Sequence, residues 1–355
     1  MLKKIETFLL KKSSDLIGID IGTGTIKLAE IAVKGHQPVL KNYAIIDLPD
    51  KTVENGHIVD PEKLSATLNK LLSMTRTSSK NAVVAVGGRV TFARELTFPK
   101  MTVKELGEAI KWDVGKYIPY TPGSFNFDFS IIGSGNTENE MKVLLVASPL
   151  ENIETIVKVV KKVGLIPVAV DIEPLALYRI FTDVQQQMVI DIGADFSQII
   201  VFQNGSPSVV RNIPLGGQNF TQVIMDELKM DFNEAEKMKE TKFILSQSNV
   251  GEEYSKVQSQ MELVVSEFVQ HISRTAEYYQ QQNKNSKIDK IFVTGGGARL
   301  DHFTERLTAK LDFPAELYDP LTKLKLPRNL EKTHLQKVAP QLATAIGLAL
   351  RGGGE

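Results

Sequence analysis

One pattern occurs twice in this chain: an apolar run, the residues IDIG, a short turn and a second apolar stretch. The first copy spans residues 16–31 (LIGIDIGTGTIKLAEI) and the second spans residues 187–205 (QMVIDIGADFSQIIVFQNG). Apolar runs of this length on both sides of a glycine turn predict β-hairpins. Chance recurrence of IDIG at strand ends does not account for the repeat of the flanking strands. The repeat therefore predicts an α/β chain with two related halves.

Each predicted hairpin carries an aspartate at the lip of its turn, Asp20 in the first copy and Asp191 in the second. Glycines in such a turn let backbone N–H groups approach an anion closely, and threonine hydroxyls add donors. An acidic side chain beside a polyphosphate makes sense when a divalent cation lies between them. We therefore expect a cleft between the halves that grips a nucleotide phosphate tail and Mg²⁺ from both sides.

These motifs resemble the actin-like ATPase superfamily, which includes actin, Hsp70 chaperones, sugar kinases and the cell-division protein FtsA. GTGTIK at residues 22–27 is similar to the superfamily's first phosphate hairpin. Within the superfamily, nearly the whole chain is most similar to the PilM family of type IV pilus assembly proteins. The resemblance implies a two-lobed actin-like ATPase fold, built from duplicated ribonuclease-H-like domains, with an inserted α+β subdomain of the FtsA 1C type.

The pattern of the chain changes near residue 88, where we place the start of the insert. Before it, Asp60 and Pro61 open a predicted helix, and afterwards short alternating strands surround a helix that begins with a Thr102–Glu105 capping box. With the resemblance, this predicts the first part of lobe I at 1–87, the insert at 88–164, lobe II at 188–334, and connecting helices that complete lobe I at 165–187 and 335–355.

The resemblance also implies roles for single residues. Asp20 and Asp191 would hold Mg²⁺ through water molecules, Lys27 would reach the phosphates, and Glu173 would orient the attacking water. For Glu173 the alternative is an ordinary acid near a helix start, and for Glu236 with Lys239 it is an ion pair on a solvated helix face. The residues expected to bind ATP are Asp20, Gly22, Thr23, Gly24, Thr25, Lys27, Asp191, Gly193, Ala194, Asp195, Gly216, Gly217, Glu236, Lys239, Gly295, Gly296 and Gly297.

Composition excludes several classes of function. Lys plus Arg and Asp plus Glu both number 42, so no overall field attracts nucleic acid. Cysteine is absent, which rules out disulfides and thiolate metal sites and suits a reducing cytoplasm. No apolar run is long enough to span a bilayer, and no signal peptide is visible. We therefore expect an intracellular protein, and the resemblance implies that it is cytoplasmic and peripheral to the inner membrane through its partners.

Two segments point to contacts beyond the nucleotide. The first twelve residues, MLKKIETFLLKK, predict a basic amphipathic helix, for which we favour docking on protein over contact with lipid. Trp112, the only tryptophan, falls off the apolar stripe of its predicted helix, and contact with a partner and packing between subdomains are equally weighted.

The resemblance implies an adaptor rather than a metabolic enzyme. In the PilM family, the insert and the adjoining first lobe receive an N-terminal cytoplasmic peptide of the membrane protein PilN; other pilus platform or motor proteins and self-association are left open. The alternatives are an FtsA-like division protein, against which the absence of an amphipathic C-terminal tail counts, and a phosphotransferase or ATPase with real turnover. A phosphotransferase needs a carboxylate base and a second substrate pocket, and no acid has a clear claim to that role.

Overall fold

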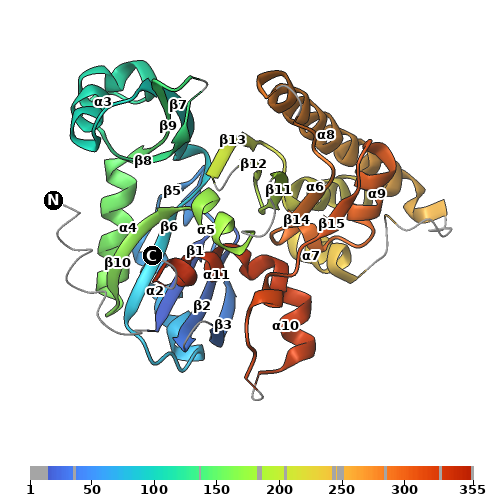
Figure 1. Cartoon of the computed structure of the whole chain (residues 1–355). Coiled ribbons are helices and arrows are strands. Elements are labelled where there is room, and N and C mark those ends of the chain that lie inside the picture. Colours follow the sequence, from blue (N-terminus) through green and yellow to red (C-terminus); the bar gives the residue numbers. More distant parts are fainter. Residues whose placement is uncertain are drawn as a thin grey trace.

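Two five-stranded sheets with the same topology form the centres of two lobes (Figure 1). In both sheets, three antiparallel strands that follow one another in the chain are extended by two parallel strands. The first sheet joins β3 (Gln37–Asp47), β2 (Thr25–Lys34), β1 (Leu16–Ile21), β6 (Asn81–Val86) and β10 (Ile166–Ile172). The second joins β13 (Ser206–Ile213), β12 (Ser197–Gln203), β11 (Gln186–Ile192), β14 (Ile291–Thr294) and β15 (Ala315–Leu317). The matching order confirms that the chain has duplicated halves.

This computed structural model describes residues 15–352, apart from 35–36, 136, 182–185, 204–205, 242–244, 246–251, 284–285 and 328–329. The basic segment at the N-terminus lies outside the described residues. Within them, no helix is both long enough and apolar enough to cross a membrane.

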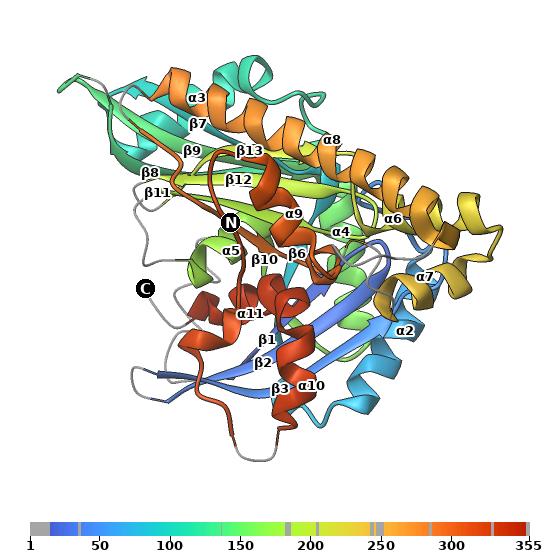
Figure 2. The same ribbon diagram turned by 90° about the vertical axis from the view of Figure 1, so that its right-hand side faces the viewer.

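Both predicted hairpins form where the repeat places them. Each apolar run becomes a strand, and most residues of β1 and β12 are buried. Helices cover the two sheets, and the longest of those described, α8, runs alongside the sheet of lobe II (Figure 2). They are α2 (Pro61–Met74), α6 (Gly217–Leu228), α7 (Phe232–Thr241), α8 (Glu252–Gln282), α9 (Phe303–Lys310) and α10 (Lys332–Val338). As expected, α8 contributes its apolar stripe to the core of lobe II, with Met261, Phe268 and Ile272 fully buried.

A smaller α+β unit is inserted between β6 and β10. It holds the 3₁₀ turn η1 (Gly88–Val90), β7 (Phe92–Pro99), α3 (Val103–Tyr117), β8 (Phe125–Ser134), β9 (Glu140–Pro149) and α4 (Leu150–Lys162). The strands form an antiparallel sheet in the order β7-β9-β8, on which α3 packs. The Thr102–Glu105 capping box is present at the start of α3. By contrast, α4 packs into the core of lobe I through Ile156, Val159 and Val160. The last helix of the predicted insert is therefore shared with lobe I, and the division at 88 and 164 stays a proposal.

Trp112 is 87% exposed on α3. The expectation that it packs between subdomains is therefore wrong, because the apolar face of α3 is turned toward its own sheet through Leu106 and Ile110. Contact of Trp112 with a partner stays a prediction.

Two helices lie between the sheets and connect the lobes: α5 (Glu173–Ile180) and α11 (Ala343–Ala349) (Figure 1). Helix α11 packs closely on both β1 and α5, because a glycine lies at each contact. A Cβ added at Gly18 of β1 would lie 1.9 Å from the carbonyl oxygen of Ala345, and one at Gly347 would lie 2.0 Å from that of Ala176. The single helix predicted over 338–350 is instead a 3₁₀ turn, η4 (Ala339–Leu342), followed by α11, since Pro340 supplies no N–H to a continuous helix.

Candidate functional site

The turns of the two hairpins meet across a cleft between the lobes. Each turn is closed by the same hydrogen bond: the N–H of Gly22 donates to the carbonyl of Thr25 at 3.0 Å, and that of Gly193 donates to Phe196 at 3.1 Å. A Cβ added at Gly24 would lie only 3.1 Å from the Cβ of Ala194 in the other turn. The repeat therefore brings two glycine turns of the same construction face to face.

Lys27 is a positively charged side chain among the carboxyl groups of the cleft. The ammonium of Lys27 lies 3.1 Å from the carboxylate of Asp20, and the two residues are register partners on β1 and β2. Burial would lower the pKa of Lys27, but the charge of Asp20, supported by Asp191 and Glu173, holds that pKa above its ordinary value of 10.5. Lys27 is thus a buried cation surrounded by carboxyl groups.

The other two carboxyl groups have raised pKa values. Burial, with the nearby charge of Asp20, raises the pKa of Asp191 to about 6, although Lys27 and a 3.3 Å hydrogen bond from Thr344 oppose the rise. Burial raises the pKa of Glu173 to about 8, helped by Asp20 and Asp191. Such crowding of acids around one lysine indicates a place where a further cation is favourable.

A third glycine segment closes the cleft from lobe II. Gly295 follows β14 with φ +91°, a conformation suited to glycine, and a Cβ there would lie 2.3 Å from the Asp191 carboxylate. The predicted helix after these glycines begins only at α9, after a 3₁₀ turn, η2 (Gly297–Arg299). The N–H of Gly295 donates to the carbonyl of Pro340 in η4 at 3.0 Å, which ties the loop to the connecting segment.

The cavity between these turns has an empty volume of about 570 Å³, including its mouth. Most of the sequence-predicted residues line it. They are Asp20, Gly22, Thr23, Gly24, Thr25, Lys27, Glu173, Asp191, Gly193, Ala194, Gly295 and Gly296.

The other predicted residues do not line this cavity: Asp195, Gly216, Gly217, Glu236, Lys239 and Gly297. Gly217 nevertheless adjoins it, since a Cβ added there would lie 3.7 Å from the carbonyl oxygen of Gly193, which lines the cavity, and 3.6 Å from the Lys239 ammonium. Glu236 and Lys239 form an ion pair at 2.6 Å, and Lys239 also donates to the hydroxyl of Thr221 at 2.7 Å. The pair is partly buried against α6, so it is not the freely solvated pair that charge alone suggested.

The cavity also contains residues that the sequence analysis did not single out. They are Ile192, Phe196, Gln198, Pro340, Gln341 and Thr344. Aligning the two hairpins would have found one of them: Gln198 faces Asp191 on β12 as Lys27 faces Asp20 on β2. Pro340, Gln341 and Thr344 come from the connecting segment, and no local motif marks them.

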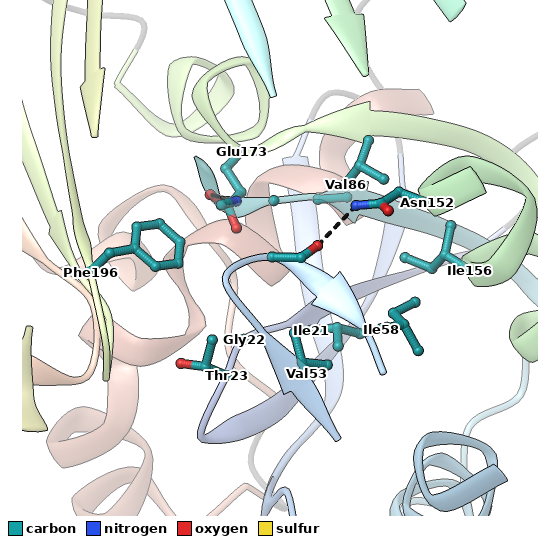
Figure 3. A pocket seen from close by; sticks show the side chains of 14 residues that line it. Ile21, Gly22, Thr23, Val53, Ile58, Val86, Asn152, Ile156, Glu173 and Phe196 are labelled. Atoms are coloured by element: carbon teal, nitrogen blue, oxygen red, sulfur yellow. Dashed lines mark hydrogen bonds between the residues drawn. The ribbon is translucent and has the colours of Figure 1, made fainter. Parts of the chain in front are cut away.

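A second cavity lies on the lobe I side of the first turn (Figure 3). Its walls are mostly apolar, from Ile21, Val53, Ile58, Val86 and Ile156, while Glu173 and Phe196 lie together at one end. Asn152, its one amide, is already engaged: its N–H donates to the carbonyl of Gly56 at 3.0 Å, and its oxygen lies 3.0 Å from His57 Nδ1. The cavity thus offers few free polar groups apart from Glu173.

The residues of the cleft fit a phosphate chain with a hydrated cation. Backbone turns without side-chain bulk cradle an anion, and Lys27 supplies a positive charge. Among the described residues, no group of three His, Cys, Asp or Glu side chains forms a direct metal cage. Mg²⁺ retains much of its hydration in proteins, so a pair of carboxylates is sufficient to hold it through water.

Comparison with known proteins gives the family. A sequence model of the type IV pilus assembly protein PilM family matches residues 18–353. The chain belongs to this family. It is also similar to the solved PilM-PilN type IV pilus biogenesis complex, with a TM-score of 0.85 and 26% identity over 97% of this chain and 100% of that one.

More distant relatives share the fold. The cell division protein FtsA of Bacillus subtilis (strain 168) is 23% identical over 251 residues, which are 63% of this chain but only 57% of FtsA. MreB5 of Spiroplasma citri, solved with ADP bound, has a TM-score of 0.52 and 14% identity, and the match covers 94% of both chains. Together with the PilM-family match, they confirm the two-lobed actin-like ATPase fold.

Proposed function

We propose that this PilM-family protein binds Mg²⁺ and ATP between its lobes and works as a cytoplasmic adaptor in the assembly of a type IV pilus or a related machine. One observation carries the nucleotide part: two equivalent glycine turns, each with its aspartate, face one another across a single cavity. Membership of the PilM family supports the machine, and the ADP bound to MreB5, which has the same fold, supports the ligand class.

The cleft would hold the nucleotide by position rather than by covalent chemistry. The backbone and hydroxyl groups of residues 22–25 and 193–195 would bind the phosphates, and Lys27 would act as a point charge. Bound Mg²⁺ would supply positive charge against the acids, held through water by Asp20 and Asp191. Gly295, Gly296 and the Glu236–Lys239 pair adjoin the lobe II side, where the adenosine would lie.

The partner we propose is the N-terminal cytoplasmic peptide of a PilN-like inner-membrane protein. The solved protein that this chain matches over 97% of its length was captured in a PilM-PilN complex. We place the peptide on the α+β unit and the adjoining part of lobe I. The protein would then be cytoplasmic and reach the inner membrane through this partner, with further pilus platform or motor proteins as additional contacts.

The second cavity argues against a sugar phosphotransferase. It adjoins the nucleotide cleft and shares Glu173 with it, as an acceptor pocket would. A polyhydroxylated acceptor needs several free polar groups to hold its hydroxyls, however, and the polar atoms of Asn152 are already bonded within the protein. Any transfer of the γ-phosphate would therefore be to water, and Glu173 is the residue to test for orienting that water.

A titration tests the proposal. Purified protein is titrated with a peptide that copies the cytoplasmic N-terminus of the PilN-like protein from the same genome, with and without Mg·ATP. We expect saturable binding that is lost when the peptide's sequence is scrambled and when exposed residues of the α+β unit are substituted. No binding in either state, together with rapid ATP turnover, would refute the adaptor and favour an enzyme.

A further inference from the structure

A hydrogen-bond chain crosses the cleft from lobe II to the start of the α+β unit. The amide of Gln198 donates to the side-chain oxygen of Asn212 at 2.9 Å, between register partners on β12 and β13. The amide of Asn212 in turn donates to the carbonyl of Gly88, the first residue of the α+β unit, at 3.3 Å. The N–H of Gly88 lies 3.4 Å from the Glu173 carboxylate. Four residues from two lobes are thus connected at one edge of the nucleotide cavity.

The carbonyl of Gly88 fixes the donor and acceptor of each side-chain hydrogen bond in this chain. A backbone carbonyl only accepts, so the side chain that meets Gly88 must present its NH₂ group. Asn212 therefore turns its oxygen toward Gln198, and Gln198 must answer with its own NH₂ group. This leaves the side-chain oxygen of Gln198 unused, in a residue that lines the cavity. It is buried in a residue only 3% exposed, and no partner for it is present among the described residues.

The chemistry of that oxygen limits what it can bind. It accepts hydrogen bonds, and the phosphates of a nucleotide at neutral pH are acceptors as well, so the two would repel. The donor that accompanies a metal-bound nucleotide at this place is water, above all water polarised by a divalent cation. Gln198 is therefore suited to distinguish a phosphate chain with its hydrated cation from one without it.

Gly88 is the point where such a signal would leave the cleft. It is the first residue of η1, has φ +78°, and is enclosed, since a Cβ there would lie 3.0 Å from Gly56 and 3.4 Å from Phe196 of lobe II. The chain continues directly into β7, the edge strand of the inserted sheet that lies beside β13. In Figure 1, β13 of lobe II lies next to β7 in the upper part of the view. A shift of Asn212 would thus reach the inserted unit without passing through the connecting helices α5 and α11.

We propose that Gln198 and Asn212 form a relay that makes the position of the α+β unit, and hence its grip on a PilN-like peptide, depend on hydrated Mg²⁺ in the nucleotide cleft. This rests on the proposed function. It adds the route of regulation and the two residues that would carry it. Both are positioning residues, since they act on the unit through Gly88.

Hydrogen exchange of residues 88–99 provides a readout that needs neither turnover nor the peptide. In the wild-type protein we expect slower exchange there with Mg·AMPPNP than with AMPPNP and EDTA. Asn212→Leu and Gln198→Met should abolish that difference, and Asn212→Ala should repeat the result of Asn212→Leu. Gln187→Met is the matched control, because Gln187 is also a buried glutamine of the lobe II sheet with an unpartnered oxygen, but it does not line the described cavities. It should keep the wild-type response.

The affinity for the PilN-like peptide tests whether the relay changes the grip of the α+β unit. We expect wild-type affinity for the PilN-like peptide to change by about fivefold or more on addition of Mg·AMPPNP. This ratio should fall to about 1 in Asn212→Leu, and the double variant with Gln198→Met should lose no more than the single variants, because both act in one chain.

The outcomes separate two failures. If the wild-type protein binds Mg·AMPPNP in a direct titration but Asn212→Leu shows the full wild-type response in exchange and in peptide affinity, the relay is refuted and the proposed function stands. A wild-type peptide affinity that is equal in both nucleotide states also refutes the relay. If the wild-type protein binds no Mg·AMPPNP at all, the nucleotide part of the proposed function fails, and the relay fails with it.

Discussion

The two hairpins of the cleft have the same strand arrangement, the same turn length and the same closing hydrogen bond, yet the residue that faces the aspartate differs. Asp20 faces Lys27 in lobe I, whereas Asp191 faces Gln198 in lobe II. The first aspartate has a neutralising partner at 3.1 Å, and the second has a pKa raised to about 6. Two turns of the same construction therefore differ in charge: lobe I offers a lysine beside its aspartate, and lobe II offers the neutral amide that we propose as a sensor of hydration.

A second difference lies two residues before each aspartate, where β1 has Gly18 and β11 has Val189. Gly18 is needed because α11 lies directly on β1, while Val189 is buried in the cluster between the sheets. Gly18→Ala should cost about 3 kcal/mol of unfolding free energy, since its Cβ would meet backbone atoms that cannot move cheaply. Gly115→Ala on α3 is the control, because nothing lies within 4 Å and a helical glycine is replaced.

Urea denaturation measures both variants. The control should be more stable than wild type by about 0.5 to 1 kcal/mol. Equal stability of Gly18→Ala and the wild type would mean that α11 does not rest on β1 as described.

Asp191→Ala removes the acid that lobe II offers to Mg²⁺. We expect Mg·ATP affinity to fall by about 100-fold, or about 2.7 kcal/mol, with the fold intact. Isothermal titration calorimetry measures the affinity, and circular dichroism checks the fold. Unchanged affinity in a folded variant would remove Asp191 from the site.

Glu173 should make the unliganded protein less stable as pH rises. Its folded pKa of about 8 lies above its ordinary value of 4.5, so the folded state holds a proton that the unfolded state releases between these values. Stability is greatest below pH 4.5 with respect to this group and falls as pH rises toward 8. Glu173→Gln should flatten the slope and stabilise the protein by about 2 kcal/mol at pH 6.

Thermal melts from pH 4.5 to 8 test this expectation. Glu108→Gln, on the exposed face of α3, should leave the slope as it is in the wild type. A weaker slope below pH 6 should persist in Glu173→Gln because the pKa of Asp191 is raised as well. Equal slopes in wild type and Glu173→Gln would show that Glu173 is ionised in the folded protein at all these pH values.

Sequence alone predicted what is encoded locally. Apolar runs around Asp20, Asp191 and Gly295 fix the strands and turns, so their convergence follows from the duplicated topology. Residues such as Thr344 could not be predicted, because they reach the cleft only after α11 packs between the sheets. For Trp112 the reverse holds. Its place off the apolar stripe of α3 indicates that it is exposed, but no pattern in the chain indicates which partner it would contact.

Lys27→Gln tests the comparison of the hairpins directly, because it gives lobe I the uncharged partner that lobe II has. We expect ATP affinity to fall about tenfold, or about 1.4 kcal/mol, and the pKa values of Glu173 and Asp191 to rise further, since Lys27 now opposes both increases. The loss should be largest without Mg²⁺, where no other cation offsets the phosphates. Gln198→Lys, the reciprocal change, should strengthen binding of metal-free ATP and weaken the dependence on Mg²⁺. If both variants bind ATP with wild-type affinity in the presence and absence of Mg²⁺, the asymmetry of the hairpins has no role in nucleotide binding, and the two turns are equivalent in function as well as in construction.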